Sequence, residues 1–278
     1  MRRIALLFTV LSILLLAVNL HAQAPQWQTS ACTADEASAN GNWAGLSDSP
    51  QEHLCEVRSI ILPLAGDRMD VASTNGAIHI VGENRKDIAL TVRVTAHASG
   101  KDAVQQLVQQ VKIIIDGTIH DEGPQASGIF SRSGYSASYT LHVPLHFASK
   151  VDSLNGGIDI EQVEGTLRLH TTNGGIKLTE VRGDVQAHTV NGGIKASLGG
   201  DPWQGSGFTA KTVNGGVHLV VPEHCSAHLT ADTVNGGISV NFPVTVQGAI
   251  GRHLDTNLGQ GGPTIHLQTV NGGISVSH

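Results

Sequence analysis

The chain has 278 residues, of which 33 are glycine and only 4% are aromatic. Its formal net charge is −6, and the 23 acidic residues outnumber the 17 basic ones, which argues against a nucleic-acid partner. Few charges and many glycines favour a β-rich repeat protein with tight turns.

Residues 1–24 have the pattern of a secretory signal peptide. Arg2 and Arg3 form a basic start, and Ile4 to Val18 is an apolar run. Small residues then offer a cleavage signal that ends either at Ala24 or at Ala22. The run is short for a membrane-spanning helix, and an uncleaved N-terminal anchor is the alternative interpretation. We therefore expect an exported protein of the periplasm, the cell surface or the medium, with no transmembrane segment in the mature chain.

Residues 25–58 lack hydrophobic periodicity and are interpreted as an irregular lead-in. Cys32 and Cys55 lie in this one short segment, and export permits a disulfide between them. The third cysteine, Cys225, lies at the approach to a strand, where we expect a buried and inert thiol.

Residues 59–148 are predicted to form an N-terminal β region with one short helix. The helical pattern covers residues 101–110, and residues 69–80 form a first, isolated copy of a motif that dominates the rest of the chain. Alternating apolar residues predict further strands at 88–94, 111–115 and 139–143.

A repeated Asn-Gly-Gly motif defines residues 149–278. The intervals between its asparagines are 18, 18, 23, 21 and 36 residues. Because the last interval is twice the first, we expect a degenerate copy near Asp255 to Gly259. Together with a variant copy, Asn-Gly-Ala, the repeated asparagines are Asn75, Asn155, Asn173, Asn191, Asn214, Asn235 and Asn271.

Each copy has the pattern strand, turn, strand, because apolar and polar residues alternate on both sides of the asparagine. Two all-β folds fit this pattern. Asn-Gly is a strong hairpin signal, which would give an antiparallel β-meander. We favour a parallel β-helix, or β-solenoid, with coils of roughly 18 residues, because stacking places equivalent residues about 4.8 Å apart and rewards identical columns. The asparagines would then form a ladder at the turns, and the glycines would supply positive φ angles.

These motifs resemble the bacterial putative-adhesin family, whose domains have unknown function and are related to the head domains of surface adhesins. The resemblance rests on Asp70 to Ile78, on Tyr139 to Pro144, on the serial Thr-Val-Asn-Gly-Gly-Ile copies and on Gly261 to Pro263 before the last copy. It covers roughly residues 60–278. It implies a β-helical envelope protein and supplies no catalytic residues.

Histidine is the one residue type whose excess suggests chemistry, with 15 copies. His170 and His188 share one column, but a zinc site needs further ligands that the column does not supply. We interpret this column as a solvated face, because it also contains Asp152, Lys211, Asp232 and Gln268. The other histidines that we considered are expected to diverge or to face solvent: His142, His146, His218, His224 and His228.

A β-helix could also carry a polysaccharide lyase or hydrolase, which needs convergent carboxylates. The acidic residues of the repeats alternate with Lys177, Arg182 and Lys195 and do not recur in one column, so we interpret them as surface charge: Asp159, Glu161, Glu164, Glu180 and Asp184. No Walker loop, nucleophile elbow or Cys-x-x-Cys pair is present. We expect no catalytic residues, no metal and no cofactor, and only Trp203 suggests a platform for a sugar ring.

The last copy ends at Ile274 without a capping segment after it. A terminal coil exposes unpaired backbone groups, so we expect this edge to pair with a second copy of the chain or with another envelope protein. The sequence thus predicts a non-enzymatic, exported envelope protein, an adhesin or a scaffold, that binds a surface protein or glycan. The alternative is a β-helix protein that binds or cleaves envelope polysaccharide.

Overall fold

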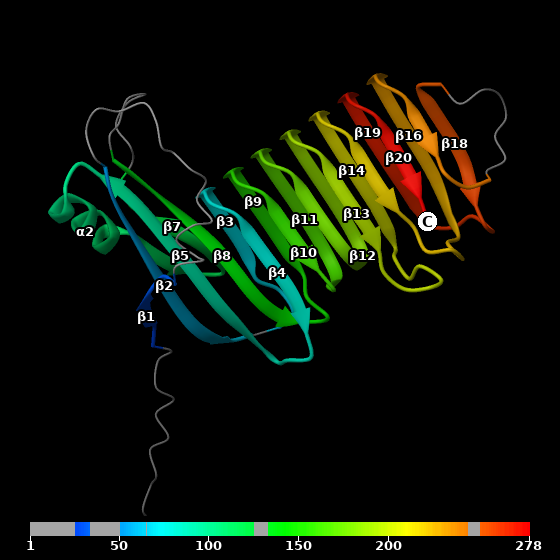
Figure 1. Ribbon diagram of the computed structural model, residues 1–278. Helices are drawn as coiled ribbons and strands as arrows, with labels where there is room; N and C mark the ends of the chain where they lie inside the picture. The colour runs from blue at the N-terminus through cyan, green and yellow to red at the C-terminus, as the bar shows by residue number, and fades with distance from the viewer. Residues whose placement is uncertain (1–25, 34–50, 65, 125–132, 244–250) are drawn as a thin grey trace, which may run out of the picture.

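The computed structural model describes residues 26–33, 51–64, 66–124, 133–243 and 251–278. The predicted signal peptide lies outside them. The described residues form an all-β protein, as predicted (Figure 1). Their strands make a 20-stranded mixed sheet, and they include a single helix. No helix in this described part is both long and apolar enough to cross a membrane.

The N-terminal elements form an antiparallel sheet in the order β1–β2–β5–β8. Helix α2 packs on it through Val104 and Val108, next to Ala96 and Ala98 of β5. The predicted disulfide joins Cys32 to Cys55, with 5.5 Å between the Cα atoms, and so ties the end of β1 to β2. The bounds are β1 Gln28–Ala31, β2 Glu52–Pro63, β5 Asp87–Ala98, α2 Lys101–Gln110, β6 Lys112–Ile115, β7 Thr118–Glu122 and β8 Gly134–Pro144. Strand β1 and the start of β2 lie in the lead-in, where the sequence pattern predicts no strand.

The repeats form two parallel ladders that run side by side (Figure 1). One ladder has the order β7–β3–β9–β11–β12–β14–β19–β16, and the other β8–β4–β10–β12–β13–β15–β20–β17. The bounds are β3 Asp70–Asn75, β4 Ile78–Glu83, β9 Ser149–Asn155, β10 Ile158–Glu161, β11 Glu164–Asn173, β12 Ile176–Asn191, β13 Ile194–Leu198, β14 Gly207–Asn214, β15 Val217–Val220, β16 Ala227–Asn235, β17 Ile238–Val240, β18 His253–Leu258, β19 Thr264–Asn271 and β20 Ile274–Ser277.

We call one copy of the motif, with the strand before it and the strand after it, a coil. The two strands of a coil do not pair with each other but in parallel with the strands of neighbouring coils, so the antiparallel meander is wrong for the repeats. Asn173 lies opposite Asn191, and Thr171 opposite Thr189. This register is required because the residues two, four and six before each asparagine point into the core, and a one-residue shift would turn them outward.

The coils are not stacked in chain order. Strand β19 lies between β14 and β16, and β20 lies between β15 and β17. The coil of Asn271 therefore separates the coils of Asn214 and Asn235, and the prediction that the last copy forms the open C-terminal edge is wrong. The predicted degenerate copy near Asp255 is also wrong, because this segment lies in β18, which pairs antiparallel with β16 and covers the end of the ladder.

The motif glycines are needed for close approach rather than for a positive φ. Among them, only Gly76 has a left-handed φ, 145°. In the other coils a Cβ atom on the first glycine would overlap the carbonyl oxygen of the equivalent glycine in the neighbouring coil, as for Gly174 against Gly156. The second glycine is less crowded, since a Cβ atom on Gly175 would lie 3.3 Å from the carbonyl oxygen of Gly193.

Candidate binding site along the asparagine ridge

The seven asparagines form a continuous ridge along the turn side of the stack. In each step the Nδ2 of one asparagine donates to the Oδ1 of its neighbour at 2.8–2.9 Å, and the order is Asn235, Asn271, Asn214, Asn191, Asn173, Asn155, Asn75. All these amides point the same way, so each bond polarises the next. The ridge thereby holds the outer corner of every coil in register.

A second ladder lies just beneath the ridge. The threonine two residues before the asparagine donates to the carbonyl oxygen of the first glycine in the neighbouring coil, as Thr171 does to Gly156 at 2.8 Å. The same bond recurs at Thr189, Thr212, Thr233 and Thr269. Ser153 breaks the pattern, because its buried Oγ has no hydrogen-bond partner among the described residues.

An open groove of about 600 Å³ runs beside the ridge, across the strands of the second ladder. Its floor contains the second glycines of four coils, Gly157, Gly175, Gly193 and Gly216, where no side chain fills the space. Its wall is formed by the outward residues four positions after the asparagines, which pair in register: His79, Asp159, Lys177, Lys195 and His218. The repeat thus builds a channel perpendicular to the strands.

The groove changes in charge along its length. Lys177 Nζ lies 3.1 Å from both Asp159 Oδ2 and Glu161 Oε1, and the hydrogen bond to Asp159 raises the pKa of Lys177. Its neighbour Lys195 is exposed and has no ion-pair partner in the described part of the chain. The middle of the groove therefore offers one uncompensated ammonium group, with His218 beside it.

One group of residues has the composition of a metal site. The ligand atoms of His79, Asp159 and Glu161 lie within 4.8 Å of one another, and no other such group occurs in the described ranges. Lys177 already binds both carboxylates, so a metal ion would have to displace this cation. His170 and His188 do lie side by side, but no third ligand joins them. We therefore assign no metal to these residues.

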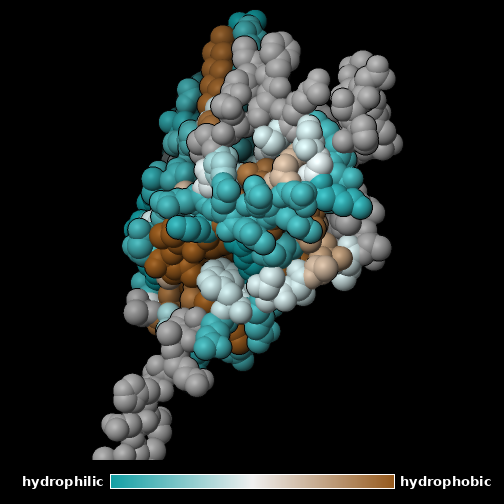
Figure 2. All heavy atoms as spheres, turned by 90° about the vertical axis from the view of Figure 1, so that its left-hand side faces the viewer, coloured by the Kyte–Doolittle hydropathy of each residue, from teal (hydrophilic) through white to brown (hydrophobic). Residues whose placement is uncertain are grey.

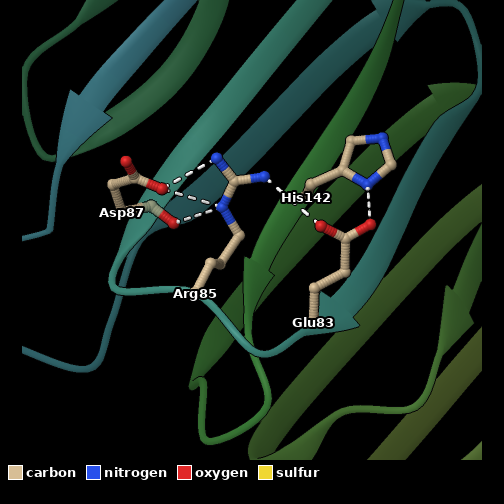
Figure 3. Close-up of polar contacts among 4 residues, drawn as sticks. All are labelled: Glu83, Arg85, Asp87 and His142. Atoms are coloured by element: carbon tan, nitrogen blue, oxygen red, sulfur yellow. Dashed lines mark hydrogen bonds and ion pairs between the residues drawn. The ribbon is translucent and has the colours of Figure 1, made fainter.

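A dense charged cluster closes the turn between β4 and β5 (Figure 3). Arg85 binds the Asp87 carboxylate at 2.7 Å and reaches Glu83 at 3.4 Å, and Glu83 binds His142 Nδ1 at 2.6 Å. The prediction that His142 and His146 face solvent is therefore incomplete for His142, which is bound by Glu83. It agrees with the His146 side chain, which is 80% exposed. Because Arg85 contacts residues two positions away on either side, the cluster is best explained as a clamp on the turn.

Two other predictions about single residues have clear outcomes. Cys225 is buried, and its desolvation raises the pKa of the thiol to about 11, which agrees with an inert thiol. Trp203 is only 8% exposed and belongs to the core, so the prediction that it offers a platform for a sugar ring is wrong.

Histidines of the C-terminal coils have carboxylate partners that the sequence does not reveal, including Asp201 for His224 and Asp232 for His253.

An exposed apolar column, not predicted from the sequence, lies on the other side of the ridge. It consists of the residues just before the asparagines, of which Leu154 is 47% exposed, Val213 40% and Val234 54%. The alternation of the strand contains the signal, because the threonine one position earlier is buried and the next side chain must point outward.

Seen from the end that carries α2, the surface is largely hydrophilic and is interrupted by apolar areas (Figure 2).

The repeat region is similar to one known family of domains. Residues 147–277 match the family described as Toastrack DUF4097. This match covers the coils from Asn155 to the end and agrees with the predicted resemblance to a domain of unknown function. No match was found among curated proteins.

Several solved structures are similar to the chain at low identity. A "putative cell adhesion protein" from Clostridium sporogenes is 10% identical with a TM-score of 0.45, and the match covers 82% of this chain and 99% of that one. A "putative adhesin" from Bacteroides fragilis is 12% identical with a TM-score of 0.29, covering 80% and 96%. A "putative lipid binding protein" from Parabacteroides distasonis is 10% identical with a TM-score of 0.30, covering 81% and 96%.

Proposed function

We propose that the protein is an exported, non-enzymatic binding module of the cell envelope, in which the stacked coils form a β-solenoid and the groove holds an extended anionic glycan. The observation that carries this proposal is the open groove across successive coils, with a floor of glycines and in-register polar side chains along one wall. Binding of this kind would serve adhesion or the anchoring of envelope polymers.

The shape of the groove favours a polymer over a compact ligand. Its polar groups repeat with the spacing of the strands, about 4.8 Å, so a linear chain could meet equivalent groups on several coils. The unpaired Lys195 favours an acidic group on that chain, since an ammonium gains most from a ligand that supplies the missing counter-charge. The end of the groove at Lys177, where Asp159 and Glu161 already neutralise the ammonium group, would bind less charged parts of the polymer.

The same residues argue for binding without turnover. Hydrolysis of a glycosidic bond requires one protonated carboxyl group and one ionised carboxylate on either side of the bond. In the groove, Lys177 Nζ lies 3.1 Å from both Asp159 Oδ2 and Glu161 Oε1, so the two carboxylates gather around one cation instead of facing each other across an open space. This arrangement supports the proposal of binding without hydrolysis.

Export has support from the covalent structure. The disulfide between Cys32 and Cys55 closes the N-terminal strands, and such bonds persist in the periplasm and outside the cell rather than in the cytosol. Together with the predicted signal peptide, this disulfide supports the proposal that binding occurs in the envelope or beyond it.

The test is a glycan array that records binding and product release for the same samples. Gly157→Leu would fill the floor of the groove at a position where a Cβ atom meets only the Gly175 carbonyl oxygen at 3.4 Å, and Lys195→Gln removes the free charge. Gly237→Leu is the matched control, because Gly237 lies outside the groove and has nothing within 4 Å of its Cβ position.

We expect acidic glycans to bind the natural chain and the control, and to bind both groove variants at least about tenfold more weakly. Product release from any glycan would contradict the non-enzymatic proposal. Binding that survives both groove substitutions would show that the ligand lies elsewhere on the molecule.

A further inference from the structure

One half of the groove carries cations without an anion of its own. From Lys195 in β13, the row of in-register outward side chains continues through His218 in β15 to Ser275 in β20. This row contains no acidic residue, and the two carboxylates at the other half of the groove are already bound by Lys177. A negatively charged ligand is therefore favoured at the Lys195 half.

The imidazole of His218 reaches into the groove rather than away from it. Its Nε2 would lie 3.6 Å from a Cβ atom placed on Gly216, one of the glycines of the floor. Its register neighbours on the adjacent strands, about 4.8 Å away, are Lys195 and Ser275. On its own strand, the flanking residues of the same face are Gly216 and Val220. Lys195 is therefore the one charged group next to this imidazole in the part of the chain that the structure describes.

All three side chains of the row are available to a ligand. Within the described ranges, Lys195, His218 and Ser275 have no side-chain hydrogen bond or ion pair, and the first two are exposed. Glu180 comes near this row, because its backbone N–H donates to Ser197 Oγ at 3.0 Å, but it forms no ion pair with Lys195. The row thus offers an ammonium group, an imidazole and a hydroxyl as free donors.

We propose that Lys195, His218 and Ser275 form an anion subsite of the groove, which holds a sulfate or phosphate ester of the glycan and takes up a proton on His218 when the ester binds. This inference rests on the proposed glycan groove and names the acidic group that the groove selects. A sulfate or phosphate monoester presents three terminal oxygens, one for each of the three donor side chains on successive coils. A carboxylate presents only two.

Proton uptake follows from the charges around His218. Histidine side chains change their charge between about pH 5 and 8. The ammonium group of Lys195 opposes protonation of the neighbouring imidazole, and a bound anion favours it. Protonated His218 then supplies a second cation, so the ester binds more tightly at lower pH.

The experiment follows the histidine resonances of the full chain by NMR from about pH 5.5 to 8, without ligand and with glucose 6-sulfate, glucose 6-phosphate or glucuronate. The sulfate is the probe for proton uptake, because its own charge is constant over this range. His218→Gln identifies the resonance and removes the titrating group but keeps a hydrogen-bond donor. His79→Gln is the matched control, because His79 lies in the same row at the other half of the groove, 3.8 Å from Asp159 Oδ2.

We expect both esters to bind at least about tenfold more tightly than glucuronate near the lower end of the pH range. The sulfate should bind more weakly as pH rises, and the midpoint of the His218 titration should rise when it is bound. His218→Gln should abolish the pH dependence of sulfate binding, Lys195→Gln should weaken binding of both esters throughout, and His79→Gln should change neither. The ester that binds more tightly identifies the group that the subsite prefers.

Glucuronate binding as tight as that of the esters would overturn the subsite, as would no binding of any probe or a His218 titration that bound sulfate leaves unchanged. A monosaccharide does not span the groove, so Gly157→Leu, two coils away from Lys195, should leave ester binding intact. Ester binding without binding of any long acidic glycan would therefore contradict the groove proposal alone and leave the subsite in place.

Discussion

Single residues of the motif have roles that their neighbours in the motif do not share. The asparagine bonds along the stack, the first glycine admits the neighbouring coil, and the second glycine leaves the groove open. Each Asn-Gly-Gly motif therefore meets three different physical requirements with three consecutive residues. Substitutions at adjacent positions should have very different effects.

The asparagine ladder should be more sensitive at its centre than at its end. Asn191 both donates to Asn173 and accepts from Asn214, whereas Asn75 only accepts from Asn155. Because the side chains are exposed, each lost bond should cost only about 0.5–1.5 kcal/mol. We expect Asn191→Ala to lower the free energy of unfolding more than Asn75→Ala, as measured by urea denaturation. Equal losses would mean that water replaces the ladder bonds without cost.

The two glycines of one motif should differ more strongly. Gly174→Ala would force its methyl group onto the carbonyl oxygen of Gly156, while Gly175→Ala meets its nearest atom at 3.3 Å. We expect a loss of roughly 3 kcal/mol for Gly174→Ala, at the upper end of overpacking, and of less than about 1 kcal/mol for Gly175→Ala. Thermal and urea unfolding of the two variants measure the difference. Similar stabilities would show that the coils can separate locally.

The sequence predicts most of these residue roles because columns are visible in a repeat. It predicts the ladder of asparagines and the buried columns from spacing alone. It does not predict that Gly76 is the one motif glycine with a positive φ among the described residues. It also does not predict that the first glycine of each other motif is needed because a Cβ atom there would overlap the neighbouring coil. Both features depend on how closely neighbouring coils approach. Nor does it reveal that the Tyr135 and Tyr139 hydroxyls both donate to Asp121, because these residues meet only through tertiary packing.

At the scale of elements, β18 protects the end of the first ladder. It pairs along β16 from Asp232–His253 to Ala227–Leu258, and His253 Nδ1 lies 2.7 Å from Asp232 Oδ1. The sequence suggests a coil in this region because the last interval is twice 18 residues. The interval alone does not distinguish an additional coil from a strand that covers the end of the ladder, because either could fill the segment between the copies of Asn235 and Asn271.

Attachment of β18 should depend on pH through His253. The hydrogen bond from His253 to Asp232 raises the pKa of His253 in the folded protein. A raised pKa stabilises the fold below the unfolded value, about 6.5, and this contribution is lost as pH rises through the folded pKa. We expect the amides of β18 to lose protection against hydrogen exchange, corrected for intrinsic rates, as pH rises from about 6 to 8.

The Asp232→Asn variant provides the control for this pH effect. It retains a hydrogen-bonding side chain at the partner position but removes the charge that stabilises the protonated imidazole. The pH dependence of β18 protection should therefore shrink, while that of strands far from this pair stays unchanged. Protection that rises with pH in the natural chain would contradict the assigned sign.

At the scale of the whole molecule, the inserted last coil is the feature that the sequence could least predict. Every coil presents an asparagine and an isoleucine or valine to its neighbours, and most coils also present a threonine, so each would fit beside almost any other. Hydrogen bonding alone gives no reason to prefer chain order. The structure instead places the coil of Asn271 between those of Asn214 and Asn235, with bonds to both.

Engineered disulfides can test this order directly. Cα atoms of neighbouring coils are about 4.8 Å apart, within reach of a disulfide, whereas two coil spacings, roughly 9.6 Å, exceed the limit of about 7 Å. In a Cys225→Ala background, the pair Asn214→Cys and Asn271→Cys should therefore crosslink on mild oxidation. The pair Asn214→Cys and Asn235→Cys should not, although it is closer in sequence. Peptide mass mapping of the oxidised monomer distinguishes the two outcomes, and a crosslink between 214 and 235 alone would restore stacking in chain order.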